Sequence, residues 1–168
     1  VEDYMNKVND LIGTDYKLFN YYGAADAEHI IIAMGSVNET IEETIDYLNA
    51  AGGKYGLVKV RLYRPFVAEK LVEVIPESVK RISVLDRTKE PGSLGEPLYL
   101  DVVAALKGTK FNDTPVFTGR YGLGSKDTVP AQIVAVFKNE TKPRFTIGIE
   151  DDVTNLSLEV GAPLVTTP

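Results

Sequence analysis

The sequence predicts an α/β fold, a three-layer α/β/α sandwich with a mostly parallel, five-stranded sheet. Strand-like and helix-like segments alternate along the chain, which is typical of βαβ units with helices on both faces of a sheet. His29 to Met34 is a continuous apolar run, typical of a strand covered on both faces. The 168 residues fit a single domain, 1–168, with an α/β core over about 24–150.

The N-terminal part, residues 1–23, is expected to be a helix followed by an approach segment. Four apolar residues at helical spacing predict a helix over 2–12: Tyr4, Val8, Leu11 and Ile12. Residues 16–22 are aromatic-rich and predict an extended segment that leads to the core. After the strand over 29–34, Gly35-Ser36 turns the chain into a helix over 38–51, which Gly52-Gly53 ends.

Further strands and helices alternate up to residue 149. Strands are expected over 56–62, 81–86, 116–121 and 145–149, and helices from Pro65, over 96–106 and over 130–137. Pro65 and Pro97 stand at first helical turns, where the missing N–H of proline costs nothing. Residues 88–95 form a Gly/Pro-rich loop. Residues 151–168 are first acidic and then irregular, and we interpret them as a tail or linker toward a next domain.

Composition excludes several classes of function. With 18 Lys+Arg against 24 Asp+Glu, the net charge is −6, which argues against a nucleic-acid binder. The chain has no cysteine, so it has no disulfide, thiolate metal site, cysteine-ligated iron–sulfur cluster or cysteine nucleophile of its own. No apolar run approaches the roughly 18–20 residues that cross a bilayer. We expect a cytoplasmic protein with no nucleic-acid or membrane partner.

Cationic residues follow the predicted strand ends despite the negative net charge. They are Arg61, Arg64, Arg87, Lys89, Arg120 and Lys126. Together with Gly35 and Ser36 they fall at the carboxyl edge of the sheet, where ligands gather in such folds. Clustered cations and exposed helix N–H groups suit a phosphate or a carboxylate. The alternative, which we favour, is local or inter-domain ion pairing with acidic residues of the same loops: Asp86, Glu90, Glu96 and Asp127.

Two glycine-containing turns at this edge resemble phosphate-binding loops. Ser36 with Glu39 fits a capping box and Asn38 is an alternative N-cap, so helix capping is favoured over an anion cradle. The turn Gly122-Leu123-Gly124 matches neither the phosphate-loop pattern nor Gly-x-Gly-x-x-Gly. We interpret it as a turn that lets another surface approach closely.

No set of residues assembles a catalytic or metal site. His29 is the single histidine and starts a strand, away from the expected ligand edge, so we interpret it as structural. The three adjacent carboxylates Glu150-Asp151-Asp152 alternate in direction and are expected to face water. The chain by itself is therefore not predicted to be an enzyme.

A series of segments in order resembles the pyruvate:ferredoxin (flavodoxin) oxidoreductases over nearly the whole chain. They are Tyr21-Tyr22-Gly23-Ala24, Ala27-Glu28-His29, Met34-Gly35-Ser36-Val37, the run from Val60 to Phe66, the run from Val84 to Gly92, the run from Gly119 to Lys126, and the run from Pro143 to Ile149 with Asp152-Val153-Thr154. The resemblance implies an excised fragment, the second core domain, with a transketolase C-terminal-like fold.

The resemblance also implies the reaction of a parent chain, pyruvate plus coenzyme A plus oxidised acceptor giving acetyl-CoA, CO2 and reduced ferredoxin or flavodoxin. The parent cofactors it implies are thiamine diphosphate with Mg and [4Fe-4S] clusters, with CoA as substrate. Neither the thiamine-diphosphate motif, Gly-Asp-Gly followed by Asn, nor the cluster cysteines occur here. We therefore expect this domain to bind no cofactor alone and to be inactive when isolated.

The implied partners are the other domains of the same chain, a second copy in a homodimer, and ferredoxin or flavodoxin. The cationic residues are then expected to contact a neighbouring domain or a ligand near the cofactor or CoA region. The alternative is a free-standing acidic module that binds a phosphorylated metabolite at the same edge. These alternatives stay open from the sequence.

Overall fold

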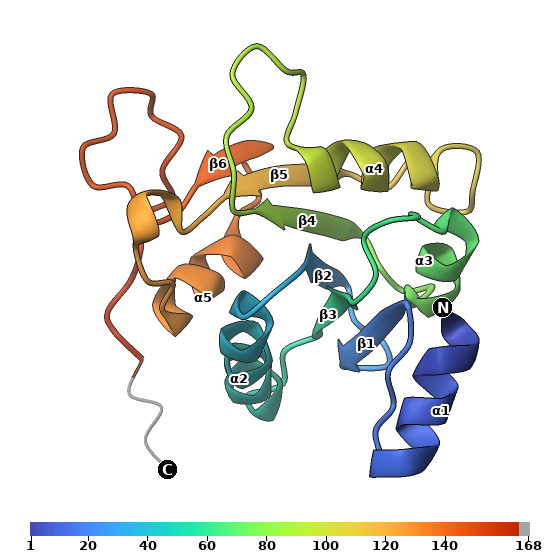
Figure 1. Ribbon diagram of the computed structural model, residues 1–168. Helices are drawn as coiled ribbons and strands as arrows, with labels where there is room; N and C mark the ends of the chain where they lie inside the picture. The colour runs from blue at the N-terminus through green and yellow to red at the C-terminus, as the bar shows by residue number, and fades with distance from the viewer. Residues whose placement is uncertain (165–168) are drawn as a thin grey trace.

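A six-stranded sheet forms the centre of the computed structural model, which describes residues 1–164 (Figure 1). Its order is β1-β3-β2-β4-β5-β6. The strands are β1 (Phe19–Gly23), β2 (His29–Ala33), β3 (Tyr55–Val60), β4 (Arg81–Asp86), β5 (Val116–Arg120) and β6 (Arg144–Thr146). β1 pairs antiparallel with β3, and every other neighbouring pair is parallel. The five predicted strands are all present, and the last of them, β6, ends at Thr146 rather than at the expected residue 149.

β1 is the one strand that the sequence did not predict, since residues 16–22 were expected only as an extended approach. It pairs with β3 from Phe19 opposite Val60 to Gly23 opposite Gly56. The two glycines make this close pairing possible: a Cβ on Gly56 would lie 2.3 Å from the Tyr21 hydroxyl, and one on Gly23 would lie 2.5 Å from a β3 carbonyl. The sheet therefore gains an antiparallel edge strand.

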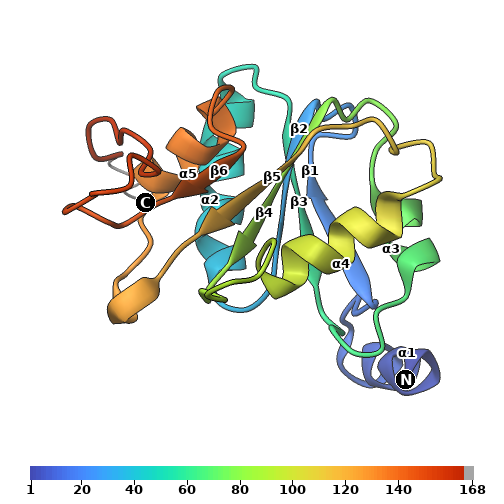
Figure 2. The same cartoon turned by 90° about the horizontal axis from the view of Figure 1, so that it is seen from above.

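Helices cover both faces of the sheet, as Figure 2 shows with the sheet seen nearly edge-on. They are α1 (Glu2–Ile12), α2 (Val37–Ala50), α3 (Ala68–Val74), α4 (Pro97–Leu106) and α5 (Pro130–Lys138). α2 and α5 lie on one face, and α3 and α4 lie on the other. The predicted three-layer sandwich is confirmed.

The core is divided by the sheet into two apolar clusters. Ile30 and Ile32 of β2 pack with the helices α3 and α4, whereas Ile31 and Ala33 pack with α2 and α5. Successive strand side chains point to opposite faces, so a strand that is buried on both faces must be apolar throughout. This explains the unbroken apolar run in the sequence.

The short helix predicted from Pro65 begins later, at Ala68 in α3. Phe66 packs edge-on against Phe19 of β1, with ring centroids 5.4 Å apart, and against Tyr63 at 6.2 Å. Insertion of Phe66 between β1 and the preceding loop keeps residues 65–67 out of the helix. The prediction of a helix opening at Pro65 was wrong.

The acidic run after β6 forms a turn rather than a site. Asp152 accepts hydrogen bonds from the Thr154 hydroxyl at 2.6 Å and the Ser157 N–H at 2.8 Å. These bonds lower the pKa of Asp152 to about 2. Ser157 then forms an isolated parallel bridge with Thr146 of β6.

The predicted tail over 151–168 is described as far as residue 164, and its last four residues lie outside the described range. Of the described helices, none combines the length and the apolar character that crossing a membrane requires.

His29 is a structural residue at the amino end of β2, as the sequence predicts. It is buried, and its Nδ1 lies 2.8 Å from the Phe137 carbonyl oxygen while Nε2 lies 2.9 Å from the Ser83 hydroxyl. Arg81 Nη2 lies 3.0 Å from the same Nδ1 and 3.1 Å from the Phe137 carbonyl oxygen, so His29, Arg81 and this carbonyl form one cluster. Burial, together with the charge of Arg81, lowers the pKa of His29 from 6.5 to about 3.

We predict that His29 makes the fold acid-sensitive. The folded pKa lies below the unfolded one, so its contribution is complete above pH 6.5 and is lost as the pH falls toward 3. Within this window the unfolding free energy should fall by about 1.4 kcal/mol per pH unit from this group alone. Urea unfolding at a series of pH values measures the slope, and His29→Gln should lack this part of it. Equal slopes for the two proteins would contradict the assignment.

Candidate functional site

The strand order reverses at the centre of the sheet, between β2 and β4. From β2 the chain passes through α2 to β3 on one side of β2, and from β3 it passes through α3 to β4 on the other side. The loop after β2 therefore leaves toward α2, and the loop after β4 leaves toward α4 on the opposite face. Ligands of open α/β sheets bind at such a reversal, outside the carboxyl ends of the strands.

Two adjoining cavities open at this reversal. The larger, about 420 Å³, is lined by Met34, Gly35, Ser36, Tyr63, Leu85, Asp86, Arg87, Thr88, Pro97 and Tyr121. The smaller, about 290 Å³, is lined by Ser36, Val37, Thr40, Arg87, Tyr121, Lys126, Asp127 and Thr128. Ser36, Arg87 and Tyr121 belong to both. Of the eight predicted site residues, the structure thus brings together Gly35, Ser36, Arg87 and Lys126. We call these two cavities the switch-point site.

The amino end of α2 opens onto the switch-point site without a side-chain cap. Ser36, the N-cap, forms no cap hydrogen bond. Asn38 lies inside the helix and is buried, and its Oδ1 has no partner among the described residues. Neither predicted form of capping is present, because Ser36 already has helical dihedral angles (φ −66, ψ −22) that take its hydroxyl away from the cap position. The N–H groups of Asn38 and Glu39 donate to the carbonyls of Gly35 and Ser36, both at 3.2 Å, whereas the Val37 N–H has no acceptor among the described residues.

Arg64 is occupied by a neighbour on α4. Its Nη2 lies 2.8 Å from Asp101 Oδ2, and its guanidinium stacks on the Tyr63 ring, 3.9 Å from the centroid. The Tyr63 hydroxyl donates to the same carboxylate at 2.7 Å. The hydrogen bond to Asp101 raises the pKa of Arg64 above its ordinary value. Arg64 therefore holds the loop after β3 against α4. This pairing could not be predicted, because Asp101 belongs to a helix and not to the loops at the strand ends.

Arg120 is also committed within the domain. Its Nε donates to the buried carboxylate of Glu96, whose side chain is 2 % exposed. The other oxygen of Glu96 accepts the Glu90 N–H at 2.7 Å. The ion pair therefore fastens the end of β5 to the loop before α4. This confirms local pairing for one of the four acidic residues considered from the sequence.

Asp86, which was also considered as an ion-pair partner, caps α4 instead. Its two oxygens accept the N–H groups of Leu98 at 2.9 Å and Tyr99 at 3.2 Å. A carboxylate at this place satisfies donors that have no partner within the helix and complements the helix dipole. Burial raises the pKa of Asp86 above its ordinary value. The pairing of Asp86 with a cation was a wrong expectation.

Arg87 and Lys126 are the uncommitted cations of the switch-point site. Within residues 1–164, no carboxylate oxygen lies within 4.0 Å of their charged nitrogens. Arg87 makes one long contact, from Nε to the Gly122 carbonyl at 3.4 Å. A Cβ at Gly122 would lie 2.8 Å from that Nε, so glycine is what lets Arg87 approach. The predicted close approach at this turn is thus made by a side chain of the same domain.

The other two predicted cations lie outside the cavities. Arg61 stacks on Tyr16, with its guanidinium carbon 5.2 Å from the ring centroid. Lys89 is exposed in the loop after β4 and lines neither cavity.

Tyr121 is a residue of the site that the sequence analysis did not include. It is buried between the two cavities, and its hydroxyl donates to the Met34 carbonyl at 3.4 Å. Its position directly after β5, at the carboxyl edge of the sheet, is the feature from which the sequence could have identified it as a site residue.

The arrangement is suited to binding an anion. Donors and positive charge come from Arg87, Lys126, the Ser36 hydroxyl and the positive end of the α2 helix dipole. Among the described residues there is no cluster of three His, Cys, Asp or Glu side chains that could hold a metal ion. The single histidine lies at the opposite edge of the sheet.

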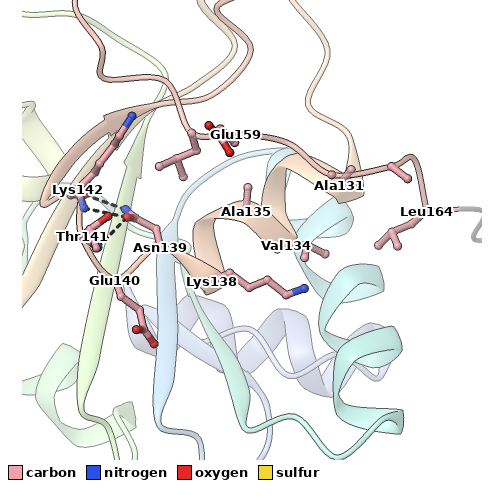
Figure 3. A pocket seen from close by; sticks show the side chains of 13 residues that line it. Ala131, Val134, Ala135, Lys138, Asn139, Glu140, Thr141, Lys142, Glu159 and Leu164 are labelled. Atoms are coloured by element: carbon pink, nitrogen blue, oxygen red, sulfur yellow. Dashed lines mark hydrogen bonds between the residues drawn. The ribbon is translucent and has the colours of Figure 1, made fainter.

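A larger cavity, about 710 Å³, lies elsewhere and lacks convergent charge (Figure 3). It is enclosed by α5, the turn over 138–142 and the chain over 158–164. Lys138 and Lys142 extend in different directions, and Lys142 Nζ donates to the Ser157 carbonyl at 2.7 Å. Asn139 uses its amide within the turn, to Lys142. These contacts hold the turn together, and none of the predicted site residues lines this cavity.

Comparison with known proteins gives consistent matches. The sequence model of the family described as pyruvate:ferredoxin oxidoreductase core domain II matches residues 27–133, a range that contains all eight predicted site residues. The pyruvate-flavodoxin oxidoreductase of Enterobacter agglomerans is 56 % identical over 162 residues, covering 94 % of this chain and 14 % of that protein. The pyruvate:ferredoxin oxidoreductase of Moorella thermoacetica is 54 % identical over 172 residues, covering 100 % of this chain and 15 % of that protein.

The chain thus spans about one seventh of the length of these relatives. Among solved structures, the 2-oxoglutarate:ferredoxin oxidoreductase from Magnetococcus marinus aligns with a TM-score of 0.48 at 20 % identity. That alignment covers 77 % of this chain and 20 % of the other.

We predict that the two arginines at this edge differ in their effect on folding. Arg120→Ala should lower the unfolding free energy by about 3 kcal/mol, because it leaves the Glu96 carboxylate buried without its charge partner. Arg87→Ala should change it by less than about 0.5 kcal/mol, as exposed and unpaired side chains do. Urea unfolding measures both, and adding Glu96→Gln to Arg120→Ala should restore part of the loss. Equal losses for the two single variants would contradict this division.

Proposed function

The chain belongs to the pyruvate:ferredoxin oxidoreductase family, as its core domain II, and from this we propose that it is one domain of a larger oxidoreductase. The reaction proposed for the parent polypeptide is pyruvate plus coenzyme A plus oxidised acceptor giving acetyl-CoA, CO2 and reduced ferredoxin or flavodoxin. The names of the relatives that match over nearly the whole chain support this proposal. A second copy of the parent, ferredoxin or flavodoxin are its proposed partners.

This domain is proposed to contribute no cofactor ligand to that reaction. A [4Fe-4S] cluster needs cysteine thiolates, and the chain has none. Thiamine diphosphate needs a Mg²⁺ held by carboxylate and carbonyl oxygens, yet the family motif for it is absent and the switch-point site presents cations instead. The residues of this chain do not fit either group. Other domains of the parent would hold both cofactors.

We assign the domain an organising role, exercised through the switch-point site. Arg87 and Lys126 lie beside the uncapped amino end of α2 and have no acidic partner within the described domain. We propose that they bind an anionic group on a neighbouring domain of the parent and so hold that domain in place near the cofactor or CoA region. The free-standing metabolite-binding module receives no support from the relatives.

We predict that neutralising both cations damages the parent enzyme without unfolding this domain. Arg87→Ala with Lys126→Ala in the full-length polypeptide should lower kcat/KM for pyruvate- and CoA-dependent acceptor reduction at least tenfold. One tenfold step corresponds to about 1.4 kcal/mol, the size of a single charged inter-domain contact. Steady-state kinetics at physiological ionic strength measures the change.

The matched control is Lys107→Ala, which removes an exposed cation at the other end of α4, outside the switch-point site. It should leave the kinetics unchanged. If the double variant also kept wild-type kinetics, the proposed contact would be wrong. If the double variant lost its activity together with the unfolding stability of this domain, its cations would be structural instead.

A further inference from the structure

The helix α1 presents an apolar face that this domain leaves uncovered. None of its residues is buried. The exposed fractions are 72 % for Tyr4, 42 % for Val8, 82 % for Leu11 and 60 % for Ile12. Positions i, i+4, i+7 and i+8 lie on one side of a helix, so these four side chains form a continuous stripe. Contiguous apolar surface of this kind marks an interaction site in soluble proteins.

The stripe is held in a fixed orientation by contacts on the adjacent side of α1. Met5 packs against the apolar cluster beneath α3 and α4. The Asn9 amide donates to the Tyr16 carbonyl at 2.9 Å and accepts the Tyr16 N–H at 2.7 Å. Glu2 lies 3.8 Å from Lys70 of α3. α1 is thus attached to the domain, and its stripe faces outward as a preformed surface.

α1 also lies at the same edge as the switch-point site. The segment between α1 and β1 meets the carboxyl end of β3, where Arg61 stacks on Tyr16 and the Leu18 carbonyl accepts the Arg61 N–H at 3.0 Å. Both views show α1 at the margin of the molecule, outside the two helix layers (Figures 1 and 2). A neighbour that reaches the cationic edge is therefore well placed to reach α1.

We propose that the α1 stripe docks against an apolar surface of another domain of the same parent polypeptide. This inference rests on the proposed function, in which the chain is one domain of a larger oxidoreductase. Each of the two relatives reported above has most of its length outside the region that this chain matches, so a neighbouring domain is available to cover the stripe.

Charge at the margin of the stripe gives the chemistry of the neighbour. At 3.6 residues per turn Lys7, the one basic residue of the helix, lies next to Leu11 at the edge of the stripe, and its Nζ lies 5.1 Å from the Tyr4 ring centroid. Asp3 and Asp10 lie beyond Lys7, toward the side of the helix opposite the stripe. The fitting partner is an apolar groove of another domain that carries an acidic group at the edge that faces Lys7.

Hydroxyl-radical footprinting of the full-length native polypeptide tests this directly. The labelling rates of Tyr4 and Leu11 should be at least tenfold lower in the native protein than in the same protein unfolded in urea. Rates close to those of the unfolded protein would overturn the proposal. Protection that disappears on dilution to the monomer would also overturn it, because the cover would then be a second copy.

A pair of variants separates docking from folding. Leu11→Lys places a charge on the stripe, and Asn6→Lys places the same charge on an exposed position outside it. In the full-length protein, Leu11→Lys should raise the amide hydrogen exchange of residues 2–12 at least tenfold, whereas Asn6→Lys should not. Equal exchange in both variants would contradict docking.

Acceptor reduction by the same preparations separates this inference from the proposed function. A protein with Tyr4 protected but no pyruvate-dependent activity would refute the reaction and keep the docking. An active protein with Tyr4 unprotected would refute the docking alone.

Discussion

Burial of β2 on both faces is the constraint on which the rest of the structure depends. All five of its residues are buried, and alternate side chains supply the two apolar clusters. A strand in this position requires helices on both sides, so the chain must pass over one face after β2 and over the other after β4. The loops then diverge, and a pair of cavities is left at the carboxyl edge. The site follows from the topology and not from a sequence motif.

The charges at that edge have two different roles, and the position of the acidic side chains decides between them. Glu96 and Asp101 lie against the sheet or on α4 and take Arg120 and Arg64 as partners, so these arginines connect loops within the domain. Arg87 and Lys126 face open cavities and have no such partner in the described domain. A net charge of −6 does not reveal this local arrangement. It depends on which acidic residues the helices bring to the same edge.

The parallel strands and their covering helices could be predicted because they depend on local apolar patterns. β1 could not, because an edge strand is defined by its partner, and the paired glycines Gly23 and Gly56 have no local signature. The start of α3 was misplaced because Phe66 packs against Phe19, a contact between distant parts of the chain. For the site, sequence reasoning found the residues at the strand ends. It could not assign their partners, since Asp86 serves α4 as a cap and Asp101 lies within that helix.

The central claim is that this domain works as part of a larger oxidoreductase, and the size of the native polypeptide tests it most directly. An antibody against this domain, applied to lysate of the source cells and to fractions active in pyruvate- and CoA-dependent acceptor reduction, reports both size and activity. The account predicts one band several times larger than 18.4 kDa that co-elutes with the activity. A band at 18.4 kDa, separate from the activity, would contradict it.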